Sequence, residues 1–247
     1  MKLTDFKVLA FDVYGTLIDW ESGMVAGLQP LTNRVNKEKG RLLSRDEILQ
    51  AHAFHESTQQ RYTPTKRYQE LLPFVYRRMA EQWGVTVTWD ECLTYGQSVK
   101  LWPAFPDSAA SLQYLKQHYK IVVLTNTDND SFMYSQAKLQ VDFDSIYTAE
   151  DVGSYKPADR NFDYMLEMLA TQGVEKKDIL HTAESMFHDH EPANRFGLTC
   201  CHIYRRFDQK GFGATMAPGE MPIVQCKFNS MAEFVEAHKS ECSDSHE

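Results

Sequence analysis

Asp12 occupies a position in the sequence where a carboxylate could contact a substrate. It directly follows residues 7–11 (KVLAF), a short apolar run that is typical of a buried parallel strand. Open α/β sheets bind ligands at the carboxyl ends of such strands, and Gly15 allows the chain to turn sharply there. The alternative interpretation is an aspartate that only caps a turn. Taken alone, Asp12 does not decide between the two.

Three further groups of polar residues follow apolar runs or precede helical segments. They are Thr125 and Asn126 after residues 121–124, Lys156 before a proline, and Glu184 and Asp189 after residues 179–183. Each group also has an ordinary interpretation: a turn at a strand end, a solvated surface charge, or a polar loop before a helix. Their chemical meaning depends on the elements that position them.

Apolar runs alternate with helical segments through most of the chain. The predicted strands are residues 7–11, 121–124, 146–149, 179–183 and 200–204. The predicted helices between and after them are residues 108–118, 157–169 and 191–196, with a C-terminal helix that begins at the capping box of residues 230–233. Strands that alternate with helices predict an α/β fold with a parallel sheet. The polar residues 240–247 are expected to be frayed.

One long segment interrupts this alternation. Residues 18–100 contain no convincing strand, but they do contain the capping boxes of residues 44–47 and 88–91. We predict an all-helical insert at residues 18–100, with residues 1–17 and 101–247 forming the sheet-containing core.

The composition limits the classes of function. The chain has 247 residues and a net charge of −8, which argues against a nucleic-acid partner. No apolar run approaches the ~20 residues that a membrane span needs. The five cysteines include no C-x-x-C pair, so neither a metal cage nor a disulfide framework is expected. We therefore expect a cytoplasmic protein.

Residues 12–17 (DVYGTL) resemble motif I of the haloacid dehalogenase superfamily, D-x-[D/Y]-G-T-L. The three other groups resemble motifs II, III and IV of that family and occur in the same order. The resemblance implies a Rossmann-like core with a helical cap between motifs I and II. It also implies that Asp12 forms a covalent aspartyl intermediate. Thr16 belongs to motif I, and Thr125 and Asn126 would contact the departing group.

The residue at position 14 separates two chemistries within the family. Its phosphatases have a second aspartate there, which protonates the leaving oxygen, whereas its 2-haloacid dehalogenases have Tyr or Phe. Tyr14 therefore points to carbon–halogen cleavage, because a halide leaves without a proton. In this interpretation Asp12 attacks the carbon that bears the halogen, and Asp189 activates the water that hydrolyses the ester. Lys156 would neutralise the nucleophile and the substrate carboxylate, and no metal would be needed.

Motif IV favours the alternative, a Mg²⁺-dependent phosphatase. Dehalogenases have Ser and Asn where this chain has Glu184 and Met186. The carboxylates of Asp12, Glu184 and Asp189 could hold Mg²⁺ together with the Tyr14 carbonyl. A histidine could then replace the missing acid; the candidates are His52, His55, His188 and His190. A third alternative is a non-catalytic binding module on the same scaffold.

The expected substrate is a small anion, and a homodimer is an expectation by analogy with the family. In the dehalogenases a cap arginine receives the halide. The candidates here are Arg41, Arg45, Arg61 and Arg67. We expect Tyr14, Trp20 and Phe54 to contact the substrate, while most other aromatic residues of the insert serve packing.

Overall fold

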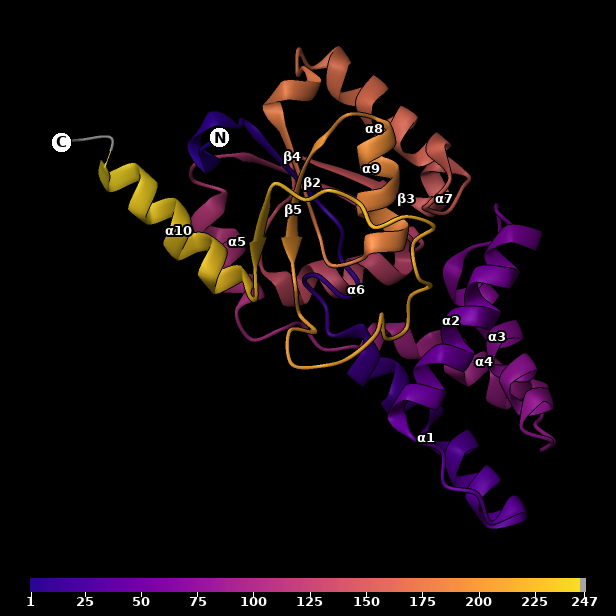
Figure 1. Ribbon diagram of the computed structural model, residues 1–247. Helices are drawn as coiled ribbons and strands as arrows, with labels where there is room; N and C mark the ends of the chain where they lie inside the picture. Colours follow the sequence, from indigo (N-terminus) through magenta and orange to yellow (C-terminus); the bar gives the residue numbers. More distant parts are fainter. Residues whose placement is uncertain (245–247) are drawn as a thin grey trace.

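Six parallel strands form one sheet (Figure 1). The computed structural model describes residues 1–244. The strands are β1 (Val8–Phe11), β2 (Lys120–Thr125), β3 (Ser145–Thr148), β4 (Ile179–Ala183), β5 (Thr199–Ile203) and β6 (Cys226–Phe228). Their order is β3-β2-β1-β4-β5-β6, so β1 is central and pairs with β2 and β4. The segments that follow these three strands therefore meet at one edge of the sheet.

Helices cover both faces of the sheet (Figure 1). One face carries α5 (Ser108–Leu115), α6 (Asn129–Leu139) and α10 (Met231–Asp244); the other carries α8 (Asp159–Thr171) and α9 (Glu191–Arg195). Leu9 and Phe11 pack in the core of the first face, and Val8 and Ala10 in the core of the second. This division follows from the alternation of side chains along a strand. Both faces of β1 are buried, which explains its uninterrupted apolar sequence.

Short elements complete the core. They are α7 (Ala149–Val152), the 3₁₀ turns η1 (Leu3–Asp5), η2 (Gln97–Leu101) and η3 (Lys176–Asp178), and the π-helical turn η4 (Met186–His190). Among residues 1–244, no helix is both long and apolar enough to cross a membrane.

The segment between β1 and β2 is helical up to α5. It contains α1 (Trp20–Lys39), α2 (Arg45–Tyr62), α3 (Tyr68–Gln82) and α4 (Trp89–Gly96), and η2 follows α4. Both predicted capping boxes are present. The helices α1–α4 lie together beside the sheet-containing part (Figure 1). We call them the helical insert; their helical structure is confirmed, whereas the division of the chain into two domains stays a prediction.

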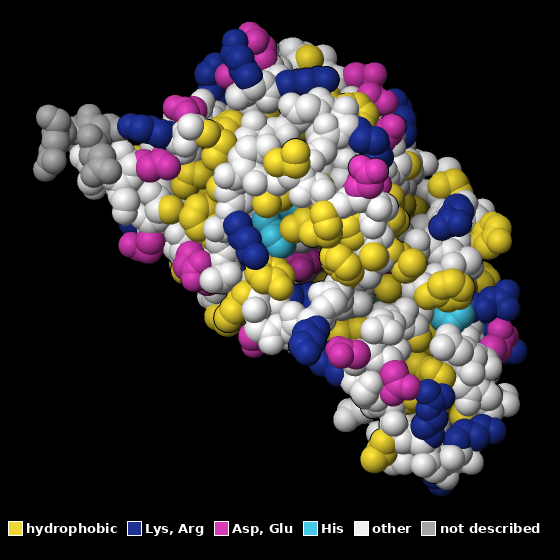
Figure 2. Space-filling model, in the orientation of Figure 1, with side chains coloured by type: hydrophobic (Ala, Val, Ile, Leu, Met, Phe, Trp, Pro, Cys, Tyr) yellow, Lys and Arg dark blue, Asp and Glu magenta, His cyan; other side chains and the backbone are white. Residues whose placement is uncertain are grey.

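Several contacts hold the insert near the carboxyl ends of the strands, and two of them are hydrogen bonds to its backbone. The backbone N–H of Gln69 donates to Asp128 Oδ2 at 2.7 Å, and the Tyr155 hydroxyl donates to the Lys66 carbonyl. On the face shown in Figure 2, hydrophobic side chains are exposed between the two parts, and basic side chains are interspersed with acidic ones.

The predicted strands agree with β1–β5 to within one residue at each end, but β6 and α6 were missed. β6 has only three residues and is half-exposed at the edge of the sheet. α6 is mostly polar and is recognisable mainly by its capping Asp128, which accepts from Ser131 N. The predicted fraying of residues 240–247 is wrong as far as Asp244, which ends α10. Residues 245–247 lie outside the described part of the chain.

Candidate active site

Asp12 lies at the carboxyl end of β1 and is 5% exposed. Its Oδ1 accepts a hydrogen bond from Lys156 Nζ at 2.9 Å, and its Oδ2 accepts one from Thr16 Oγ1 at 2.8 Å. Burial raises the pKa of Asp12 and the Lys156 ammonium opposes this rise. Two charge-assisted hydrogen bonds therefore hold the carboxylate in one orientation, as a nucleophile requires.

The turn after Asp12 depends on Gly15. Its φ of +97° is disfavoured for residues with a side chain, and a Cβ there would lie 3.0 Å from Trp20 Nε1. The turn places Thr16 between two segments. Its hydroxyl donates to Asp12 and accepts from Glu184 N at 2.9 Å, so it joins the ends of β1 and β4.

Lys156 is the cation of the site and is 1% exposed. Its ammonium group donates to Asp12, to Asp189 Oδ1 at 2.7 Å and to the Leu124 carbonyl at 2.8 Å. Burial acts to lower its pKa, but the two carboxylates outweigh burial and hold the pKa above its usual value. Asn126 fixes the Lys156 backbone through one hydrogen bond in each direction, 2.9 and 2.6 Å long. The side chain is thus charged and oriented.

Asp189 lies on the π-helical turn η4 and is 1% exposed. Its Oδ1 also accepts from His181 Nε2 at 2.9 Å, while its Oδ2 has no hydrogen-bond partner. Burial acts to raise the pKa of Asp189, but Lys156 and His181 prevail and hold it well below its usual range. The carboxylate is therefore ionised and retains one free acceptor atom.

A small cavity of about 30 Å³ lies against these groups, which is room for one or two waters. It is lined by Asp12, Tyr14, Trp20, Glu56, Tyr68, Asn126, Lys156, Ser185, His188 and Asp189. Trp20, Glu56 and Tyr68 come from the helical insert, so the insert forms one wall of this cavity, which we call the nucleophile cavity.

Two predicted substrate contacts, Tyr14 and Trp20, do line the nucleophile cavity. The Tyr14 hydroxyl is 2.9 Å from Ser135 Oγ, and burial raises its pKa to about 12, so it stays protonated. The third, Phe54, does not reach the cavity: it is 56% exposed and packs against His55 on the outer side of α2. That prediction is corrected, because the sequence could not show which face of α2 meets the core. Thr125 is buried with its hydroxyl unpaired and does not line the cavity.

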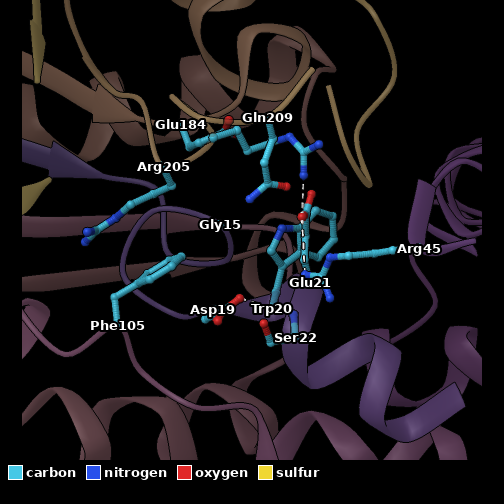
Figure 3. Close-up of a pocket in the computed structure, with 11 residues that line it drawn as sticks. Gly15, Asp19, Trp20, Glu21, Ser22, Arg45, Phe105, Glu184, Arg205 and Gln209 are labelled. Carbon is cyan, nitrogen blue, oxygen red and sulfur yellow. Dashed lines mark hydrogen bonds and ion pairs between the residues drawn. The ribbon is translucent and has the colours of Figure 1, made fainter. Parts of the chain in front are cut away.

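Glu184 lines a second cavity of about 110 Å³ (Figure 3) and does not line the nucleophile cavity. Burial and the nearby Glu21 carboxylate raise its pKa to about 8. Glu21, which lines the same cavity (Figure 3), forms ion pairs with Arg45 and with Arg206.

The predicted magnesium ligands Asp12, Glu184 and Asp189 are not brought together as a set that could hold an ion. Within the described chain, residues 1–244, no three His, Cys, Asp or Glu side chains are placed to hold an ion. Asp189 Oδ1 instead accepts hydrogen bonds from Lys156 and His181.

No arginine of the insert reaches the nucleophile cavity, although all four candidates are described. Arg45 lines the second cavity, and Arg61 lines another surface pocket. Arg41 pairs with Glu47, and Arg67 pairs with Asp130 at 3.3 Å. The expected halide-binding arginine of the cap is therefore not part of the described cavity wall. Glu56 of the insert lies there instead.

Of the four candidate histidines, only His188 lines the nucleophile cavity. Its Nδ1 is 3.3 Å from Ser185 Oγ, and burial lowers its pKa, so it is neutral at pH 7. His52 contacts Glu56, His55 contacts Gln82, and His190 bonds the Ala183 carbonyl.

Sequence reasoning missed Glu56, Tyr68 and His181 as parts of the site. His181 carried a usable signal, because a polar residue inside the apolar run of β4 must find a partner when buried. Glu56 and Tyr68 carried none, since their role depends on how the insert docks.

The chain thus combines a parallel α/β core with Asp12, Lys156 and Asp189 in contact at one edge of the sheet. Residues 6–182 match the haloacid dehalogenase-like hydrolase family, and the chain belongs to that family. It is 24% identical over 220 residues to (S)-2-haloacid dehalogenase 4A of Burkholderia cepacia, across 81% of this chain and 84% of that protein.

Solved structures with the same fold include a haloacid dehalogenase and a magnesium-bound hydrolase. The L-2-haloacid dehalogenase of Xanthobacter autotrophicus with chloropropionic acid covalently bound has a TM-score of 0.73 and 16% identity, covering 95% of this chain and 98% of that one. The magnesium-bound structure of YfnB from Bacillus subtilis, described as a HAD-hydrolase, has a TM-score of 0.71 and 15% identity, covering 95% and 99%. At these identities the likeness establishes the fold alone.

Proposed function

We propose that the protein is a hydrolytic dehalogenase that acts on a small 2-haloacid, or a derivative of one, through an ester of Asp12. The observation that carries the proposal is the contact of Asp12 with Lys156 and Thr16, in a cavity where Tyr14 replaces the acid of a phosphatase. The names of the similar proteins from Burkholderia cepacia and Xanthobacter autotrophicus support the same reaction.

The first step needs no proton donor at position 14. An Asp12 oxygen attacks the carbon that bears the halogen, and the halide leaves with the bonding electron pair. Tyr14 keeps its proton and presents an aromatic face and a hydroxyl that is held by Ser135. An ester joins the substrate carbon to Asp12 at the end of this step.

The second step needs a base beside the ester. Asp189 Oδ2 is unpaired and can accept a proton from water, which adds to the Asp12 carboxyl carbon. Lys156 fixes the other Asp189 oxygen, and neutral His188 provides a second acceptor in the cavity. Cleavage of the ester releases the hydroxylated product and restores Asp12.

The helical insert acts as a cap in this proposal. The nucleophile cavity is too small for a haloacid of six or more heavy atoms together with water, so the insert must move to admit substrate.

Halide release from 2-chloropropionate by the purified protein, with and without EDTA, tests the proposal. We expect several turnovers that chelation does not stop. Turnover of an aryl phosphate that EDTA abolishes and Mg²⁺ restores would favour the phosphatase instead. Absence of both activities, and of halide release from the neutral amide chloroacetamide, would favour a non-catalytic binding module.

A further inference from the structure

Glu56 places a third carboxylate in the nucleophile cavity. It lies on α2, is 4% exposed and lines the cavity together with Asp12, Lys156 and Asp189. Its Oε1 accepts a hydrogen bond from Gln60 Nε2 at 3.2 Å, and its Oε2 lies 3.4 Å from His52 Nδ1. Both of these groups belong to α2, and Tyr68 of α3 is a further neighbour of the carboxylate.

The charges of the cavity do not suit a carboxylate substrate. Three carboxylates, those of Asp12, Glu56 and Asp189, face one ammonium group, that of Lys156. Lys156 is already shared between Asp12 and Asp189, so Glu56 has no cation of the core beside it. A haloacid would bring a further negative charge into this buried space, where charges of the same sign repel strongly.

The other groups of the wall do not reverse this balance. Tyr68 is a neutral neighbour of Glu56, because burial and the Glu56 carboxylate hold its pKa well above the usual range. His188 is neutral for the reason given above. No arginine of the insert, including the four candidates Arg41, Arg45, Arg61 and Arg67, lines the nucleophile cavity, and Lys156 is the cation of its described wall.

We propose that Glu56 determines substrate specificity, and that the cavity takes a small neutral 2-halogenated carboxamide in preference to the haloacid anion. The amide N–H would donate to Glu56 while carbon 2 faces Asp12. This inference rests on the proposed function, hydrolysis through Asp12, and narrows its substrate class.

The reaction balances with water as the second reactant. A bond forms between Asp12 oxygen and carbon 2 as the carbon–halogen bond breaks, and the halide keeps the electron pair. Water then adds to the Asp12 carboxyl carbon, and the bond between that carbon and the ester oxygen breaks. The products are a 2-hydroxyamide, a halide ion and one proton.

Binding of non-reacting ligands tests the inference independently of turnover. Titration calorimetry would compare glycolamide with glycolate on the wild type, on Glu56→Gln and on the control Glu81→Gln. Glu81 is a surface carboxylate of α3 that pairs with Arg77 and Arg78 of its own helix and does not line the nucleophile cavity. Thermal melts would confirm that both variants are folded.

We expect the wild type and Glu81→Gln to bind glycolamide about tenfold or more tightly than glycolate. Glu56→Gln should reduce this ratio to about threefold or less, chiefly through tighter glycolate binding. A wild-type preference for glycolate, or an equal ratio in the wild type and Glu56→Gln, would overturn the inference.

Turnover separates this inference from the proposed function. Chloride release from chloroacetamide and chloroacetate would be followed over many turnovers. The chloride released by Asp12→Asn would be subtracted as background, because it measures alkylation of the five free thiols. We expect kcat/KM to favour the amide in the wild type and the ratio to fall in Glu56→Gln. If neither compound is turned over, the proposed function fails, and the calorimetric ratio still decides the role of Glu56.

Discussion

Replacement of Lys156 by methionine removes the cation between two buried carboxylates. The side chain is 1% exposed, and its ammonium group lies 2.9 Å from Asp12 and 2.7 Å from Asp189. Methionine fills a similar volume but leaves two carboxylates facing each other. Removing one partner of a buried ion pair costs about 3–5 kcal/mol of stability. We expect the free energy of unfolding of Lys156→Met at pH 7 to fall by about that amount.

The pH dependence of this loss follows from the pKa of Asp189, which is held low in the folded protein. Burial opposes that lowering, and Lys156 is the largest favourable cause. A carboxyl group with a lowered folded pKa stabilises the protein above its unfolded pKa of about 4, and this stability is lost as the pH falls further. The difference in stability between wild type and Lys156→Met should therefore be largest at neutral pH and shrink below about pH 4. Urea unfolding at several pH values would measure it.

The same substitution should also reduce activity. Burial already raises the pKa of Asp12, and loss of Lys156 raises it further, so less of the nucleophile is ionised at pH 7. We expect kcat/KM to fall by about 10²-fold or more at pH 7. The acidic limb of the pH profile should move to higher pH, because it follows the pKa of Asp12. Each unit of that pKa shift corresponds to about 1.4 kcal/mol. Near-normal kinetics with an unchanged acidic limb would refute the account of Lys156.

Three further substitutions give separate tests. Asp12→Asn should abolish turnover while the thermal melt still shows a cooperative transition; residual activity within about tenfold of the wild type would remove Asp12 as nucleophile. Glu184→Gln should raise stability above pH 8 by about 1–3 kcal/mol and leave it nearly unchanged at pH 5, because the raised pKa of Glu184, about 8, makes its ionisation in the folded state unfavourable; a stability difference that does not grow with pH would contradict this. His181→Ala should slow ester hydrolysis about tenfold, giving a burst of halide followed by slow turnover, because Asp189 Oδ1 loses its 2.9 Å donor; an unchanged kcat without a burst would show that His181 does not position Asp189.

The core of the site was predictable because its residues follow strands. Asp12, Lys156 and Asp189 are 144 and 33 residues apart in sequence, yet they converge because the segments after β1, β3 and β4 lie at the same edge of one parallel sheet. The strands were recognisable as short, largely apolar runs, and Gly15 marked the turn. Local pattern and parallel-sheet topology were therefore sufficient for this part.

Side-chain direction and docking of the insert were not predictable in the same way. Glu184 directly follows β4, but it lines the second cavity and not the nucleophile cavity. Phe54 and Glu56 are two positions apart on α2 and point to opposite environments, one 56% and the other 4% exposed. A helix presents residues two positions apart to different sides, and only tertiary packing decides which side meets the core.

The most direct test of the central claim follows the oxygen of water in a single turnover. The protein, in excess over 2-chloropropionate or chloroacetamide, would react in H₂¹⁸O, and the product and the peptide that contains Asp12 would be analysed by mass spectrometry. Attack by Asp12 predicts that the first product carries ordinary oxygen and that one ¹⁸O enters the Asp12 carboxyl group. Direct incorporation of ¹⁸O into the product, with none in Asp12, would contradict the ester intermediate and the role assigned to Asp12.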